Sequence, residues 1–208
     1  MKWNLDTNEI NNNAESIIGN LKEESVVVYC FIKNQFNEGN VTENKLLQFV
    51  FRSFYRIDNA GLTDDFKNRY FEILQLSKGN NPNLRVICND LCEIKNQRGF
   101  ESLQFSFVTK LANTVNSKFP IYDSKVAKMY SYRPLSSAKP IEDRLDSLES
   151  FYNFLLSDYS TILKNDSLSL ALSEFDKKFE KYKYIDNIKK LDFIVWSAGK
   201  LMDEYKLF

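Results

Sequence analysis

Residues 105–133 read FSFVTKLANTVNSKFPIYDSKVAKMYSYR, and this stretch decides the fold of the chain. It opens with an amphipathic segment that carries Lys110 and continues through a short polar link at residues 116–118. Pro120 has no backbone N–H and disfavours a helical conformation at Phe119, so the first helix should end before that residue. Asp123 then precedes a second helical segment. The pattern predicts a helix, an extended strap over residues 119–123 and a capped helix.

Lys110 lies at the edge of the apolar face of the first predicted helix. On a helical wheel the apolar side chains share one broad arc, as a core-facing helix requires. This arc contains Phe100, Leu103, Phe107, Val108, Leu111, Ala112 and Val115, whereas Thr109, Asn113 and Asn116 fall opposite. Partial burial favours the neutral amine of a lysine, which is a nucleophile. The alternative is a lysine whose stem covers the core while its head stays in water, and position alone favours it.

The Asp123 carboxylate can accept hydrogen bonds from the free N–H groups of the helical turn that follows it. Such bonds fix the direction of a carboxylate. An ordinary helix cap accounts for Asp123 by itself. Together with Lys110, however, it places a cation and an oriented carboxylate on either side of a forced turn. We therefore expect the Lys110 amine and the Asp123 carboxylate to approach each other in one cleft lined by aromatic side chains.

The segment from residue 105 to residue 139 is basic within a neutral chain. It holds one acidic residue and six basic ones, a balance of +5, whereas the whole chain has 28 of each sign. A basic segment in a neutral protein suggests an anionic partner. Aromatic residues are interleaved with these cations, as suits base stacking and phosphate contact: Phe119, Tyr122, Tyr130 and Tyr132. A solvated lysine face with its aromatics in the core explains the pattern equally well.

Two short motifs carry a resemblance to a known family. Ser106–Ala112 (SFVTKLA) and Phe119–Val126 (FPIYDSKV) together resemble the helix-hairpin-helix DNA glycosylase superfamily, and most closely the bacterial proteins described as 8-oxoguanine DNA glycosylase-like. Residues 52–56, 60–63 and 191–193 extend the resemblance with less specificity. In bifunctional members of that superfamily a lysine near the start of the second hairpin helix is the nucleophile, and a downstream segment containing proline supplies the catalytic aspartate. By motif, Lys110 would be the nucleophile and Asp123 the aspartate.

The resemblance also implies a partner and a mode of action. The partner would be DNA, and a damaged or modified base would be flipped into the cleft between two lobes. Lys110 would attack the sugar and form a Schiff base, and Asp123 would stabilise the developing cation or help to activate the lysine. Tyr122 or Trp196 would stack on the extruded base. The cations expected on the phosphates are Lys118, Lys125, Lys128 and Arg133.

The chain departs from the superfamily pattern in two places. The superfamily hairpin has a Gly-rich turn before the lysine, whereas residues 104–108 read QFSFV. The spacing from the lysine to the aspartate is also shorter than usual. The missing glycines favour a rival class of function, a catalytically inactive helical protein that binds nucleic acid or another partner on the same scaffold. A toxin or defence component acting on nucleic acid is a third hypothesis, for which the sequence offers no direct feature.

The remaining sequence predicts an all-α fold. Seventeen Phe and 43% hydrophobic residues are enough to build a core. Apolar periodicity predicts eight to ten helices in one domain, residues 1–208, made of two packed lobes with boundaries near the loops at 78–83 and 134–140. Residues 26–32 (VVVYCFI) could form a strand, because β-branched residues cluster there. We predict a helix instead, because no partner strand is evident.

Composition excludes several classes of site. The three cysteines are odd in number, which argues against a disulfide framework. Because the chain has no His and no fourth Cys, we expect no zinc site, no iron–sulfur cluster and no cofactor. No run is long and apolar enough for a membrane span, and the first residues lack the apolar core of a signal peptide. We expect a cytoplasmic protein.

Overall fold

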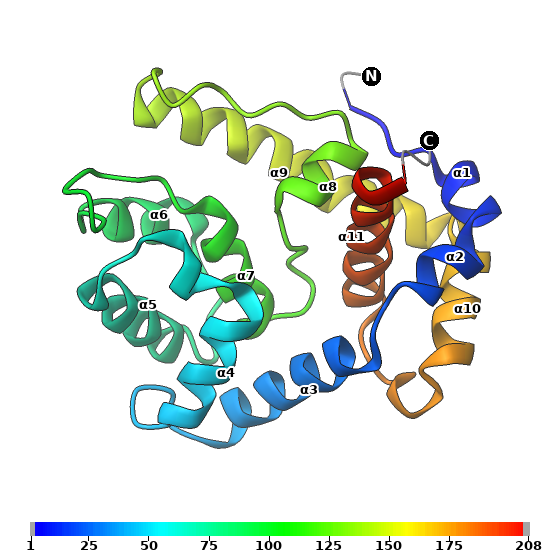
Figure 1. The fold of residues 1–208 in the computed structure, drawn as a ribbon, viewed down its shortest axis with the longest axis horizontal. Helices are drawn as coiled ribbons and strands as arrows, with labels where there is room; N and C mark the ends of the chain where they lie inside the picture. Colours follow the sequence, from blue (N-terminus) through cyan, green and yellow to red (C-terminus); the bar gives the residue numbers. More distant parts are fainter. Residues whose placement is uncertain (1–2, 206–208) are drawn as a thin grey trace. The chain divides into compact units, whose positions relative to one another are not determined.

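The computed structural model describes residues 3–205, and it describes side chains for residues 3–202. Within this range the chain forms eleven α-helices and two short 3-10 helices, and it contains no strand (Figure 1). The all-α prediction is confirmed, with one helix more than the upper limit expected. None of the described helices is both long enough and apolar enough to cross a bilayer.

The chain divides into two compact units. Unit 1 combines residues 1–25 with residues 117–208, and unit 2 is the continuous stretch 26–116. The loops at 78–83 and 134–140, where the sequence suggested lobe boundaries, lie inside unit 2 and unit 1 respectively. The dividing points instead fall inside the third helix and directly after the helix that carries Lys110.

Unit 1 is organised around its last helix. Its helices are α1 (Thr7–Asn12), α2 (Ala14–Gly19), α8 (Ser124–Met129), α9 (Ile141–Lys164), α10 (Ser169–Lys178) and α11 (Asn187–Tyr205), with the 3-10 helix η2 (Glu180–Tyr182) between the last two. In Figure 1 α11 stands between α8 on one side and α2 and α10 on the other, with α9 crossing behind it, and it packs against all four.

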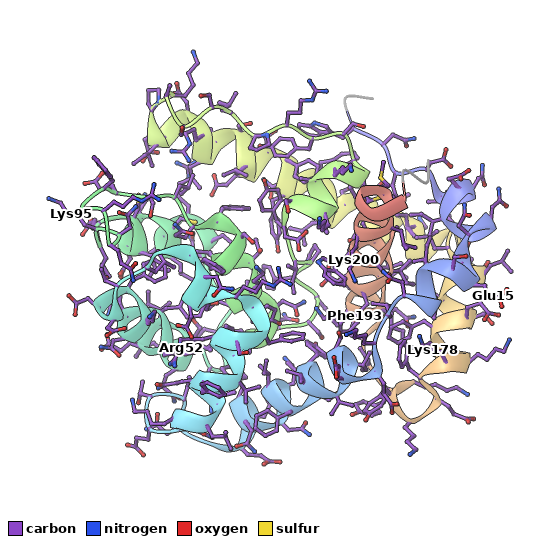
Figure 2. The ribbon with its side chains drawn as sticks, viewed as in Figure 1. Glu15, Arg52, Lys95, Lys178, Phe193 and Lys200 are labelled. Atoms are coloured by element: carbon purple, nitrogen blue, oxygen red, sulfur yellow. The ribbon has the colours of Figure 1, made fainter. Side chains whose placement is uncertain are left out.

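The middle of α11 is buried around its whole circumference. From Lys189 to Ala198 every side chain except the half-buried Trp196 is buried. Phe193, labelled in Figure 2, stacks on Phe175 of α10 with ring centroids 6.0 Å apart. A helix that is covered on all sides forms the centre of a core. The buried polar groups of α11 must therefore find partners inside the protein.

Several of these polar groups bond neighbouring segments. The Ser197 hydroxyl donates to the Ile17 carbonyl oxygen of α2 at 2.7 Å. Lys190 Nζ lies 2.7 Å from Asp176 Oδ1 of α10 and donates to the Lys183 carbonyl oxygen at 2.9 Å. Each bond connects α11 to a different part of unit 1, so the helix fixes the positions of segments that are far apart in sequence.

The contact between α8 and α11 depends on a glycine. A Cβ atom added to Gly199 would lie 2.6 Å from the carbonyl oxygen of Lys125 in α8. Real Cβ atoms essentially never come so close to a backbone oxygen, so only glycine lets the two backbones touch here. Gly199 precedes Lys200, which Figure 2 labels on α11.

Unit 2 is a separate helical core. It contains α3 (Glu23–Glu38) from Val26 onward, α4 (Lys45–Tyr55), the 3-10 helix η1 (Ile57–Ala60), α5 (Asp64–Leu76), α6 (Leu84–Cys92) and α7 (Phe105–Val115). Residues 26–32 are helical, which confirms the choice of helix over strand. Asn44, Thr63 and Asn83 cap α4, α5 and α6, each accepting a hydrogen bond from an N–H of the first turn.

Aromatic side chains fill the centre of unit 2. Phe51 of α4 lies 5.7 Å from Tyr70 and 5.6 Å from Phe71, both on α5, measured between ring centroids. Not every apolar side chain of α4 enters this core, because Leu46 and Phe49 are 62% and 59% exposed.

Substitution of Gly199 by Ala should destabilise unit 1. The added methyl group would force α8 and α11 apart, and such overpacking costs about 1–3 kcal/mol. Gly19→Ala is the matched control, because Gly19 is also a helical glycine of unit 1 and a Cβ there meets nothing within 4 Å. Urea denaturation should show a lower free energy of unfolding for Gly199→Ala alone, and equal effects of the two changes would contradict the close backbone contact.

Candidate functional site

The helix that carries Lys110 begins later than the sequence pattern suggested. α7 starts at Phe105, so Phe100 and Leu103 lie in the preceding loop, and Phe100 is 68% exposed. Thr109 and Asn113, which the helical wheel placed opposite the core, are completely buried. The wheel assumed one covered face, whereas α7 is buried on most of its circumference. The Thr109 hydroxyl donates to the Ser106 carbonyl oxygen at 3.0 Å, which makes its burial possible.

Lys110 is half-buried at the edge of the aromatic core of unit 2, where the sequence placed it. Its Nζ atom donates to Ser106 Oγ at 3.1 Å, one helical turn earlier. The same atom lies 4.8 Å from the centroid of the Phe107 ring and 5.7 Å from that of Tyr55. The Tyr70 hydroxyl donates to the Phe107 carbonyl oxygen at 2.8 Å and fixes the backbone of this turn. The lysine head is thus held toward the start of α7.

Asp123, in unit 1, caps α8 as predicted. Its backbone is extended, with φ −151°, and its Oδ1 accepts from the N–H groups of Lys125 at 2.9 Å and Val126 at 3.0 Å. The preceding helix ends before Phe119 as expected, because α7 stops at Val115. The carboxylate therefore has a defined direction at the end of the strap, residues 119–123.

Two further hydrogen bonds join the strap to α9 and α11 of unit 1. The Tyr152 hydroxyl of α9 donates to the Pro120 carbonyl oxygen at 2.8 Å. The Ile121 N–H donates to Asp192 Oδ1 of α11 at 2.9 Å. A backbone held by two buried hydrogen bonds in addition to the Asp123 cap has little freedom to move.

The aromatic residues of the basic segment belong largely to the core. Tyr122, Tyr130 and Tyr132 are buried, and the Tyr132 ring stacks on Phe151 at 4.1 Å between centroids. The Tyr122 ring lies 5.9 Å from Phe151, and burial, followed by Tyr132 and Asp123, raises the pKa of its hydroxyl. Tyr122 is thus part of the core beside Asp123. Its burial agrees with the alternative in which the lysines of the basic segment face solvent and its aromatic residues lie in the core.

The remaining predicted site residues lie nearer the surface of unit 1. Trp196 is half-buried on α11. Of the cations expected to contact phosphates, Lys118, Lys128 and Arg133 are exposed and Lys125 is half-buried. Among the described residues no group of His, Cys, Asp or Glu could hold a metal ion, and the three cysteines are buried thiols.

Sequence reasoning missed a buried ion pair beneath the strap. Lys189 and Asp192 are each 3% exposed, and Lys189 Nζ lies 3.7 Å from Asp192 Oδ2. Burial raises the pKa of Asp192 to about 7, and burial lowers the pKa of Lys189. The available signal was Asp192 inside the apolar run from Leu191 to Ala198, with a lysine three residues before it, because such charges are rarely buried unless they are paired.

Breaking this ion pair from one side should be costly. Asp192→Leu leaves the Lys189 charge buried without its counter-charge, and the loss expected for half of a buried pair is about 3–5 kcal/mol. Adding Lys189→Met removes the second charge and should recover only part of that loss, because the Ile121 N–H still lacks the acceptor that Asp192 provides. Denaturation of the wild type, the two single variants and the double variant gives the coupling energy, and additive losses would show that the two charges do not interact.

The structure gives each residue of the predicted pair a defined local setting. Lys110 is held over the Phe107 ring in unit 2, and Asp123 is held at the start of α8 in unit 1. Ser106, Tyr55, Lys189 and Asp192 are added to the residues that the sequence singled out. Comparisons with protein-family models, with curated proteins and with solved structures found no match for this chain.

Proposed function

We propose that the chain is a DNA glycosylase with an associated lyase step, in which Lys110 is the nucleophile and Asp123 the assisting carboxylate. The motifs at residues 106–112 and 119–126 and the all-α fold support this function. The observation that carries it is the Asp123 carboxylate, which two N–H groups of α8 hold in one direction at the end of a proline-containing strap.

The proposed chemistry begins with the neutral amine of Lys110. On a sugar that has lost its base, the Nζ lone pair forms a bond to the aldehyde carbon C1′. The aldehyde oxygen takes one proton from the amine and one from the surroundings and leaves as water, so that a protonated Schiff base remains. On an intact nucleotide the bond between C1′ and the base breaks instead, and the base leaves with the bonding electron pair and takes up a proton.

Asp123 would act on the positive charge of the sugar. Charge develops at C1′ as the base leaves, and a fixed carboxylate stabilises it without having to reorient. The backbone N–H groups of Lys125 and Val126 donate to this carboxylate and keep it in place. A carboxylate on a free loop would lose this advantage, because its ordering would cost conformational entropy during the reaction.

DNA is the proposed partner because the segment from residue 105 to residue 139 is basic. Lys118, Lys128 and Arg133 are exposed and can reach phosphates. We also propose that the protein acts in the cytoplasm, where thiols such as Cys30, Cys88 and Cys92 stay reduced.

A second candidate function is a catalytically inactive protein that binds nucleic acid or another partner. A specific observation favours it: the Lys110 amine lies over the Phe107 ring at 4.8 Å, and an aromatic face stabilises the ammonium form. Residues 104–108 also lack glycine, so they differ from the phosphate-binding hairpin of the active superfamily.

Borohydride trapping separates the two candidates. The reagent adds hydride to a Schiff base and leaves the protein covalently bound to DNA, so the glycosylase should be trapped on a duplex with an abasic site or with a base that it removes. Lys110→Ala should abolish trapping, whereas Lys164→Ala, at an exposed lysine of α9, should not change it. Asp123→Asn should slow trapping yet keep most of the cap, since Asn also caps well. Trapping that survives Lys110→Ala would exclude this lysine as the nucleophile.

The salt dependence of binding tests the DNA partner. Each phosphate contact contributes about 0.9 to the slope of log K against log salt on duplex DNA. Lys125→Ala with Lys128→Ala should therefore lower the slope, because the pair removes two cations of the basic segment. Lys164→Ala with Lys181→Ala, which removes two exposed cations outside this segment, is the control. Equal slopes for the two double variants would favour binding to a partner other than DNA.

A further inference from the structure

A buried carboxylate beneath the strap has no part in the chemistry described so far. Asp192 is 3% exposed, and its two oxygens have different partners. Oδ1 accepts from the N–H of Ile121, two residues before Asp123, at 2.9 Å. Oδ2 lies 3.7 Å from Nζ of Lys189. A buried charged acceptor bonded to a loop N–H holds the loop strongly, because breaking the bond would leave both groups without water.

The same face of α11 touches the chain on the other side of Asp123. Gly199 follows Asp192 by seven residues, which places both on nearly one face of the helix, about 10 Å apart along its axis. Gly199 lies against the backbone of Lys125, two residues after Asp123. One face of α11 therefore contacts the chain before Asp123 through a hydrogen bond and after it through a close backbone contact.

The charges beneath the strap lie within electrostatic reach of Asp123. Burial is the main cause that raises the pKa of Asp192, and the negative charge of Asp123 raises it further. Burial lowers the pKa of Lys189, while the charges of Asp192 and Asp123 oppose that change. Lys189 thus offers one positive charge to two carboxylates, one that anchors the strap and one that the proposed reaction uses.

We propose that Asp192 is a positioning residue for the proposed reaction: by holding Ile121 it sets the direction of the Asp123 carboxylate. The inference rests on the proposed function. Lys189 Nζ lies 3.7 Å from Asp192 Oδ2 and favours the charged form of this carboxyl group against the effect of burial. Gly199 lets α11 pack against the first turn of α8, which Asp123 caps. Asp192 does not touch DNA in this role, so it should affect the rate of the reaction and leave the affinity for DNA unchanged.

Two matched double variants test the role of the hydrogen bond from Ile121. Lys189→Met with Asp192→Asn removes both charges but keeps an oxygen that can accept from the Ile121 N–H. Lys189→Met with Asp192→Leu removes both charges and the acceptor. The rate of borohydride trapping is measured on a duplex with one abasic site, and the dissociation constant is measured on a duplex whose abasic site is reduced and has no aldehyde. Circular dichroism checks that both variants fold.

The Asn variant should be trapped at close to the wild-type rate. The Leu variant should be trapped roughly 10- to 100-fold more slowly, as expected when a reacting group is misplaced, with the same dissociation constant. Equal trapping rates for the two variants would overturn the inference, because the hydrogen bond from Ile121 would then have no effect on the reaction. A dissociation constant that rises in step with the loss of rate would overturn it as well.

Amide hydrogen exchange distinguishes failure of this inference from failure of the proposed function. If the wild type is trapped on no duplex, the glycosylase proposal fails, but the N–H groups of Lys125 and Val126 still report whether Asp123 is held. Faster exchange of these two amides in the Leu variant than in the Asn variant would support positioning by Asp192. Equal exchange would overturn it.

Discussion

Unit 1 depends on the burial of α11 around its whole circumference. A surface helix can leave its polar residues in water, but the middle of this helix has no exposed face to hold them. Its hydroxyl and charged side chains therefore bond neighbouring segments: Ser197 bonds α2, Lys190 bonds Asp176 of α10 and the carbonyl of Lys183, and Asp192 bonds the strap. Because buried polar groups must be satisfied, this one helix holds two other helices, the residue after η2 and the strap in place.

The buried pair of Lys189 and Asp192 illustrates how such bonds act. Desolvation of two charges offsets much of their attraction, so a buried ion pair adds little net stability compared with apolar residues of the same size. The pair acts mainly on geometry: a buried charged group is satisfied in one arrangement of its neighbours, so other conformations of those neighbours are disfavoured. At this place the arrangement includes the N–H of Ile121 and, two residues on, the carboxylate of Asp123.

Local features of the sequence predicted much of this structure. The proline at 120 predicted a helix that ends before Phe119, and the aspartate at 123 predicted the start of the next helix; α7 does end before Phe119, and Asp123 does cap α8. The half-buried position of Lys110 followed from its place on the apolar arc. The burial of Thr109 and Asn113 did not, since a helical wheel shows where one apolar face lies but not how many neighbours cover the rest.

Long-range features were beyond the reach of such reasoning. The hydrogen bond from the Ile121 N–H to Asp192 joins residues 71 positions apart, and no local sequence pattern near either residue predicts it. The division between the units passes through α3, where no glycine or proline interrupts the helix. A sequence shows breaks in the chain more readily than it shows which helices share a core, so the loops at 78–83 and 134–140 were the natural places to expect a boundary.

The composition of unit 1 from both ends of the chain has a consequence for its folding during synthesis. Helices α1 and α2 leave the ribosome before unit 2, but the helices that cover them are made after it. The Asn11 side chain bonds the carbonyl oxygen of Ser167, 156 residues later. Unit 2 is continuous and can complete its core in the meantime. Until α10 and α11 have been translated, the apolar side chains of Ile10, Ile17 and Ile18 cannot be buried as they are in the folded protein. A chaperone that shields apolar segments would therefore bind α1 and α2 during this time.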